Sequence, residues 1–151
     1  MFNIGIDPGA SGGIAMIDGD GHVVSCSSMP ATDRDILDLL KSLKVTVGGP
    51  VRAVIELVHS MPGQGVSSTM KFGMSVGRLH MALIAAEIPF DQVTPQTWQK
   101  ALRCQVGKTR DKNITKRRAQ ALFPHETVTH AVADALLLAE YCRRFNLGLL
   151  T

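Results

Sequence analysis

The chain has 151 residues, 45% of them hydrophobic, with 16 Lys and Arg against 13 Asp and Glu. This composition fits one compact domain over residues 1–151 and excludes a disordered or fibrous protein. Apolar runs are too short to span a membrane, no leader pattern opens the chain, and three scattered cysteines offer neither a disulfide framework nor a metal motif. We therefore expect a cytoplasmic protein without membrane contact.

Short apolar runs separated by glycine-rich turns open the chain. They predict an antiparallel meander of three strands, over residues 2–7, 12–17 and 22–27. Asp7 ends the first strand, directly before Pro8 and Gly9. Strand interiors disfavour Asp, and a glycine-rich turn lets a phosphate approach the backbone, so Asp7 is placed for a metal or a phosphate. The alternative is an Asp that only caps the turn.

Helices and strands alternate after the meander. Thr32 and Asp35 resemble a capping box that begins an amphipathic helix over 33–47. A β-branched run over 51–55 predicts a buried strand parallel to the first, and Glu56 ends it. The later pattern predicts a buried helix, a strand and three more helices, over residues 67–86, 90–94, 95–103, 112–122 and 128–145. The fold class is therefore α/β, with a mixed five-stranded sheet flanked by helices.

The helix over 67–86 is apolar nearly all round, which is the basis for expecting it to be buried. Gly73 and Gly77 are four residues apart and would permit close contact with another helix.

The last predicted helix supplies a third acid. Asp134 lies in an apolar stretch, and His130 is four residues earlier on the same face. A lone carboxylate is costly to bury unless it is paired or bound to a metal, although the helix dipole also favours an Asp near a helix start. Converging carboxylates are usually compensated by a hard cation such as Mg²⁺. Two such ions about 4 Å apart can stabilise both oxygens of a phosphoryl displacement.

A basic segment over residues 98–118 holds eight Lys or Arg and one acid, so it carries +7 and the rest of the chain −4. Such segregation indicates a surface for a polyanion, and the alternative is a solvated helix face.

These motifs resemble the RuvC family of Holliday-junction resolvases, within the RNase H-like superfold, and above all its small phage-type members. The matching segments are Gly5-Ile6-Asp7-Pro8-Gly9, Val54-Ile55-Glu56 and Ala133-Asp134-Ala135-Leu136. The resemblance implies a homodimer in a bacterial or phage-infected cell. It also implies binding of a four-way DNA junction and paired symmetric nicks that leave 5′-phosphates, with two Mg²⁺ ions or Mn²⁺ as a substitute. Asp7, Glu56 and Asp134 would be the metal-binding catalytic acids.

One position departs from the family pattern. Family members commonly carry a fourth acid or a His one turn before the final Asp, where this chain has Ala131. His130 is the nearest candidate, either to ligate a metal or to transfer the proton of the attacking water, and a solvent-facing His is the alternative.

The resemblance also assigns DNA contacts. The loop after Glu56 corresponds to the family segment at the junction centre, so His59, Met61 or Phe72 would stack on bases or wedge between them, unless Phe72 is core. Lys71 and Arg78 are candidates for phosphate contacts from the same helix. The family's basic face is matched by position and charge at Lys100, Lys108, Arg110, Lys112, Lys116, Arg117 and Arg118.

Three other functions stay open. The turn after Asp7 also resembles the first phosphate loop of sugar kinases and actin-like ATPases, but no second phosphate loop or adenosine site follows, so no nucleotide cofactor is expected. A junction-binding protein without turnover is another alternative, as is an RNase H-like nuclease acting on RNA or RNA–DNA hybrids. The superfold alone does not choose the substrate.

Overall fold

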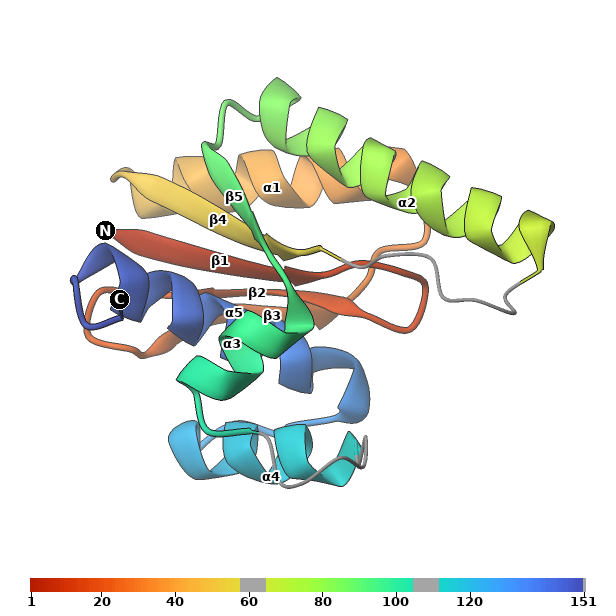
Figure 1. Ribbon diagram of the computed structural model, residues 1–151. Helices are drawn as coiled ribbons and strands as arrows, with labels where there is room; N and C mark the ends of the chain where they lie inside the picture. The colour runs from red at the N-terminus through yellow and green to blue at the C-terminus, as the bar shows by residue number, and fades with distance from the viewer. Residues whose placement is uncertain (58–64, 105–111, 151) are drawn as a thin grey trace.

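A mixed β-sheet forms the middle layer of the molecule (Figure 1). The computed structural model describes residues 1–57, 65–104 and 112–150. The strand order is β3-β2-β1-β4-β5. The strands are β1 (Phe2–Asp7), β2 (Gly13–Ile17), β3 (Val23–Ser28), β4 (Val51–Glu56) and β5 (Phe90–Val93). The first three are antiparallel neighbours, whereas β4 pairs parallel to β1 and β5 parallel to β4. The predicted mixed five-stranded sheet is confirmed.

Helices cover both faces of the sheet (Figure 1). One face carries α1 (Asp33–Val47) and α2 (Val66–Ala85), and the other carries α3 (Pro95–Ala101), α4 (Lys112–Leu122) and α5 (His130–Asn146). Side chains alternate along each strand, so Ile4 and Ile6 of β1 pack beneath α1 and α2. On the other face, Val54 of β4 packs with α3 and α5. The result is two hydrophobic cores, one on each side of the sheet.

Side-chain caps fix where two of the helices begin. The Thr32 hydroxyl accepts a hydrogen bond from the Asp35 backbone N–H at 3.1 Å, which confirms the predicted cap of α1. Thr94 caps α3 in the same way, with Pro95 at the first helical position. Because α3 begins directly after β5, its place over the sheet is set by that short connection.

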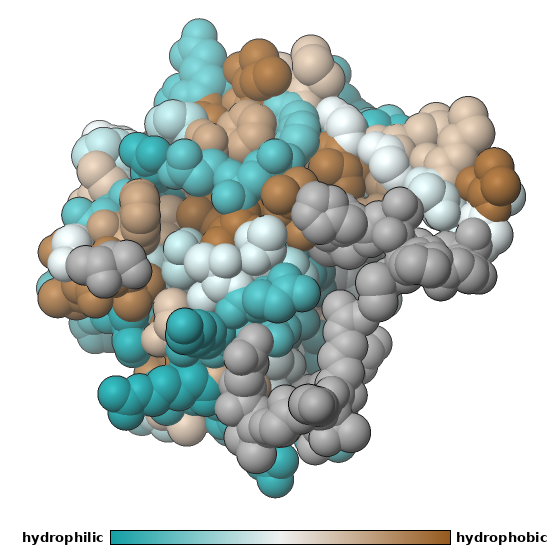
Figure 2. Space-filling view, viewed as in Figure 1, coloured by the Kyte–Doolittle hydropathy of each residue, from teal (hydrophilic) through white to brown (hydrophobic). Residues whose placement is uncertain are grey.

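The expectation that the helix over 67–86 is buried is wrong for α2. Its buried residues are Leu79, Ala82 and Leu83, all on one side. Opposite them lies an exposed apolar face, partly seen along α2 in Figure 2, whose members are Val66, Met70, Met74, Met81 and Ile84. These five side chains are 47–86% exposed. Gly73 and Gly77 lie on the same side, and a Cβ at either would meet no described atom within 4 Å. Among the described helices, none is long and apolar enough to cross a membrane.

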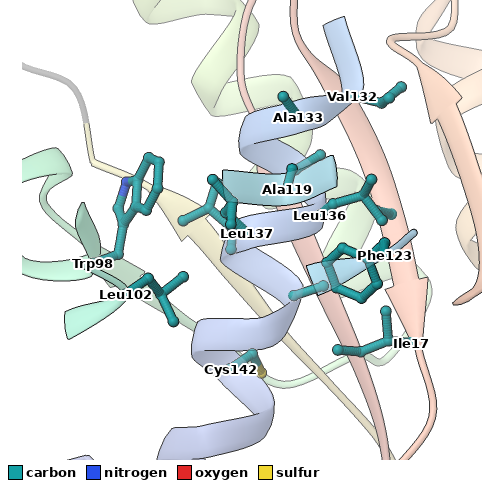
Figure 3. Packing of buried hydrophobic residues seen from close by; sticks show 14 of the residues in the cluster. Ile17, Trp98, Leu102, Ala119, Phe123, Val132, Ala133, Leu136, Leu137 and Cys142 are labelled. Atoms are coloured by element: carbon teal, nitrogen blue, oxygen red, sulfur yellow. The ribbon is translucent and has the colours of Figure 1, made fainter. Parts of the chain in front are cut away.

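Helix α5 lies against the sheet at van der Waals distance because small residues face each other there. A Cβ at Gly5 of β1 would overlap the backbone of Ala135 and Ala139, and a Cβ at Gly13 would lie 2.6 Å from the Ala131 carbonyl oxygen. Figure 3 shows the larger side chains of α5, such as Leu137, packed against the surrounding core. This approach fixes both the height and the direction of α5 over β1.

Candidate active site

Two carboxylates end neighbouring parallel strands. Asp7 is the last residue of β1 and Glu56 the last of β4, and Ile6 pairs with Ile55, so the two acids follow paired positions. Paired strands lie about 4.8 Å apart. Ile6 and Ile55 belong to the core beneath α1 and α2. Because side chains alternate between faces, Asp7 and Glu56 both face the α5 side of the sheet.

Helix α5 brings a third carboxylate to the same end of the sheet. Its backbone contacts the Gly13 position at Ala131, and Gly13 pairs with Asp7. Asp134 follows Ala131 by three residues, which puts it on the same side of the helix. Figure 1 shows α5 beginning at the sheet end where β1 and β4 finish. The fold therefore places Asp7, Glu56 and Asp134, from three separate stretches of the sequence, at the same end of the sheet.

Glu56 is the most buried of the three acids. It is 7% exposed, and its Oε2 accepts a hydrogen bond from the Trp98 indole Nε1–H at 2.8 Å. The backbone beside it is held as well, because the Leu57 N–H donates to the Val93 carbonyl at 2.7 Å. Sequence reasoning missed Trp98. The available signal was chemical, since a buried indole N–H only donates and needs an acceptor.

The donor set of this site is made of carboxylate oxygens, which suits a hard divalent cation such as Mg²⁺ or Mn²⁺. The thiol of Cys104 lies close enough to Asp134 for the two groups to interact electrostatically. Burial raises the pKa of Cys104 to about 11, with Arg118 opposing the rise and Asp134 adding to it. The Cys104 thiol therefore stays protonated at neutral pH and does not compete as a soft ligand. The residues present fit Mg²⁺.

His130 is the first residue of α5 and is exposed, one helical turn before Asp134. Ala131, which stands where the family pattern has an acid or a His, is half-buried against the Gly13 backbone.

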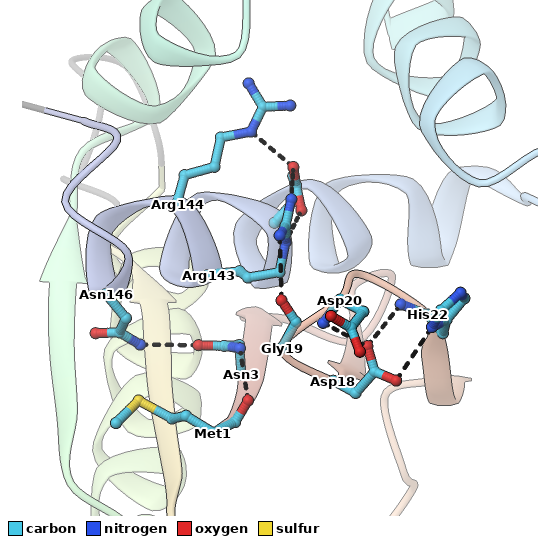
Figure 4. A network of polar contacts seen from close by, with 10 residues as sticks. Met1, Asn3, Asp18, Gly19, Asp20, His22, Arg143, Arg144 and Asn146 are labelled. Atoms are coloured by element: carbon cyan, nitrogen blue, oxygen red, sulfur yellow. Dashed lines mark hydrogen bonds and ion pairs between the residues drawn. The ribbon is translucent and has the colours of Figure 1, made fainter.

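A second acidic group lies at the opposite end of the sheet, in the turn between β2 and β3. Asp18, Asp20 and His22 place their ligand atoms within 4.8 Å of one another. Asp18 Oδ1 already accepts the backbone N–H groups of Asp20 and His22, each at 2.9 Å (Figure 4). Burial raises the pKa of Asp18, but these hydrogen bonds outweigh it and lower the pKa. The group is a turn cap beside Met1, remote from Asp7.

The proposed DNA-contact residues occupy several surfaces. Phe72 is half-buried, and its ring lies 3.6 Å from a Cβ built on Gly9, so it stands beside the loop that follows Asp7. Lys71 is exposed next to it. Arg78 instead forms an ion pair with Asp33 of α1 at 3.3 Å.

The basic residues of the 98–118 segment are placed on α3 and α4. Lys116 and Arg117 line a shallow groove on α4, and Lys100 is exposed on α3. Arg118 is half-buried and donates to the Leu102 carbonyl at 2.9 Å, which joins α4 to α3. Lys112 begins α4. His59, Met61, Lys108 and Arg110 lie outside the described residues.

Comparison with known proteins identifies the architecture. No protein-family model and no curated protein sequence matches the chain. Among solved structures, Thermus thermophilus RuvC is similar with a TM-score of 0.75 and 16% identity, covering 100% of this chain and 99% of that one. T. thermophilus RuvC in complex with a Holliday junction substrate matches with the same TM-score, 15% identity and the same coverage. The yeast mitochondrial Holliday junction resolvase matches with a TM-score of 0.55 and 15% identity, covering 97% of this chain and 79% of that one. The chain therefore has the RNase H-like fold of RuvC over its full length.

Proposed function

We propose that this protein is a metal-dependent endonuclease that resolves four-way DNA junctions. The observation that best supports this proposal is the placement of Asp7, Glu56 and Asp134 at one end of the sheet. The similarity to a RuvC bound to a Holliday junction substrate supports the choice of branched DNA over RNA or hybrids.

Asp7, Glu56 and Asp134 would hold two Mg²⁺ ions, or Mn²⁺ in their place. When bound, such ions polarise a phosphate and lower the pKa of a bound water. The proposed hydrolysis would leave 5′-phosphate and 3′-hydroxyl ends on the DNA. The protein holds the acids on rigid elements. Asp7 and Glu56 are fixed by the β1–β4 ladder, and Asp134 by the contact of α5 with Gly5 and Gly13. Exposed His130, one turn earlier, is available to ligate an ion or to take a proton from the attacking water.

DNA would lie across the α3 and α4 side of this site. Lys100, Lys116 and Arg117 would contact phosphates and so position the junction without reading its sequence. Phe72, beside the loop after Asp7, would stack on a base near the scissile phosphate, with Lys71 close to the backbone.

We further propose a homodimer formed through the exposed apolar face of α2. The residues of this face are all uncharged, so two copies can meet there without burying an unpaired charge. They are Val66, Met70, Gly73, Met74, Gly77, Met81 and Ile84. The two glycines at its middle leave room for close approach of two helix backbones. A second copy would also supply the second active site that paired nicks require.

Sedimentation of the wild type and of Met74→Glu tests the dimer. The buried Glu would be unpaired at a self-complementary interface, so we expect the variant to sediment as a monomer. Val45→Glu is the matched control, because Val45 is 80% exposed on α1, away from this face, and should leave the dimer intact. A monomeric wild type, or a dimeric Met74→Glu, would refute this interface.

Cleavage of labelled DNA tests the activity. A four-way junction, a linear duplex and an RNA–DNA hybrid are compared with Mg²⁺, Mn²⁺ or EDTA, with Asp7→Asn as the control. We expect symmetric nicks in the junction alone, with a divalent cation, and junction binding without cleavage by Asp7→Asn. Full activity in Asp7→Asn would overturn the proposed site. Binding without cleavage under every metal would indicate a junction-binding protein, and hybrid cleavage would overturn the substrate.

A further inference from the structure

The only tryptophan of the chain is hydrogen-bonded to a candidate metal ligand. Trp98 is fully buried, and its Nε1 lies 2.8 Å from Oε2 of Glu56, although the two residues are 42 positions apart in sequence. An indole N–H donates one proton and accepts none, so Trp98 is the donor and Glu56 Oε2 the acceptor. A donor held on a carboxylate restricts the plane in which its oxygens lie.

The neighbouring backbone makes this contact rigid. Glu56 pairs with Val93, the last residue of β5, and Thr94 immediately caps α3, which carries Trp98 back over the end of β4. In Figure 3, the indole lies beside Leu102 and Leu137, which belong to the same core. Both partners of the hydrogen bond are therefore held by the same strand pair, and rotation of the indole is blocked by packing.

We propose that Trp98 is a positioning residue for Glu56, holding Oε2 so that the carboxylate is oriented to take up a divalent cation. This inference rests on the proposed function, because it requires Glu56 to bind a cation. Partners that orient a metal ligand typically change metal affinity about 10-fold to 100-fold when they are removed. A purely structural Trp98 would affect stability and leave cation affinity unchanged.

The test is Mn²⁺ binding measured by calorimetry for the wild type, Trp98→Phe and Ile17→Val. Trp98→Phe keeps an aromatic ring in the core and removes the donor, so we expect Mn²⁺ binding about 10-fold or more weaker. Mg²⁺-dependent cleavage should need a correspondingly higher Mg²⁺ concentration, with a largely unchanged rate at saturation. Ile17→Val removes one methyl group from the same core away from the indole (Figure 3), so it should lower stability and keep wild-type affinity for Mn²⁺.

Wild-type fluorescence gives a second readout if Trp98→Phe does not fold. Emission of this single tryptophan should change saturably on Mn²⁺ addition, with the midpoint found by calorimetry. Unchanged Mn²⁺ affinity in Trp98→Phe, or Mn²⁺ binding to the wild type without any change in emission, would overturn the positioning role alone. If the wild type bound no Mn²⁺ and cleaved no junction, the proposed function itself would fail.

Discussion

Gly5→Ala adds one methyl group at the point where α5 contacts the sheet. The new Cβ would overlap the Ala135 carbonyl oxygen and the Ala139 nitrogen, which are backbone atoms that cannot rotate away. β1 is held by β2 on one side and β4 on the other, so α5 must move outward. Overpacking costs about 1–3 kcal/mol in typical cores. Because the obstacle is backbone, we expect a loss at the upper end, about 3 kcal/mol.

This loss leaves the chain folded at room temperature, since domains of this size have an unfolding free energy of about 5–15 kcal/mol. Each kcal/mol shifts the midpoint of a chain of this length by about 2–4 °C, so the midpoint should fall by about 6–12 °C. The same movement carries Asp134 away from Asp7 and Glu56. A misplacement of about 1 Å can reduce a rate about 100-fold, so junction cleavage should fall far more than the folded fraction.

Thermal unfolding by circular dichroism, with cleavage assayed well below both midpoints, measures the two effects separately. Gly19→Ala is the matched control, because its Cβ would lie 3.6 Å from the Met1 carbonyl oxygen, an ordinary contact. It should change stability by about 0.5 kcal/mol or less and leave cleavage unaffected. An unchanged midpoint together with full cleavage in Gly5→Ala would refute the close packing of α5 on β1.

Three further predictions each concern one small part of the protein. Burial raises the pKa of Glu140, but hydrogen bonds from two arginines outweigh it and lower the pKa, so its stabilisation is present above about pH 4.5 and is lost as the pH falls through the lowered value. Urea unfolding of the wild type and Glu140→Gln should therefore differ at pH 7 and converge in acid, and a difference independent of pH would contradict this. Thr32→Ala removes the α1 cap and should cost about 1 kcal/mol in urea unfolding, whereas no change would show that the Asp35 N–H bond contributes nothing. Replacing Lys116 and Arg117 by Ala should weaken junction binding and reduce the slope of log affinity against log salt by about 2, and an unchanged slope would remove them from the DNA interface.

The fold was predictable because its signals are local. Strand alternation, the Thr32 cap and Pro95 at a helix start act within a few residues, and the structure keeps the corresponding elements. The sequence also predicted that Asp7 and Glu56 end neighbouring strands. Their shared face depends in addition on the β1–β4 register, which is a long-range pairing that the structure supplies.

The Trp98–Glu56 hydrogen bond was not predictable in this way. It joins residues 42 positions apart, and the pairing depends on β5 ending beside Glu56 before α3 turns back over β4. Read alone, Trp98 is one more large apolar residue in a short helix. Only the tertiary arrangement makes its single donor a neighbour of a buried carboxylate.

The misjudged burial of α2 has a different physical origin. Burial of an apolar side chain away from water is favourable, but the hydrophobic effect is non-directional. An apolar residue therefore does not indicate which surface, if any, packs over it. The sequence of α2 is apolar on two opposite sides, and the fold covers only the side of Leu79 and Leu83. The opposite side, with Met70 and Met74, is covered by no described part of the chain. The expectation of burial was therefore right for the side of Leu79 and Leu83 and wrong for the opposite side, because an apolar pattern does not say how much of a helix the fold covers.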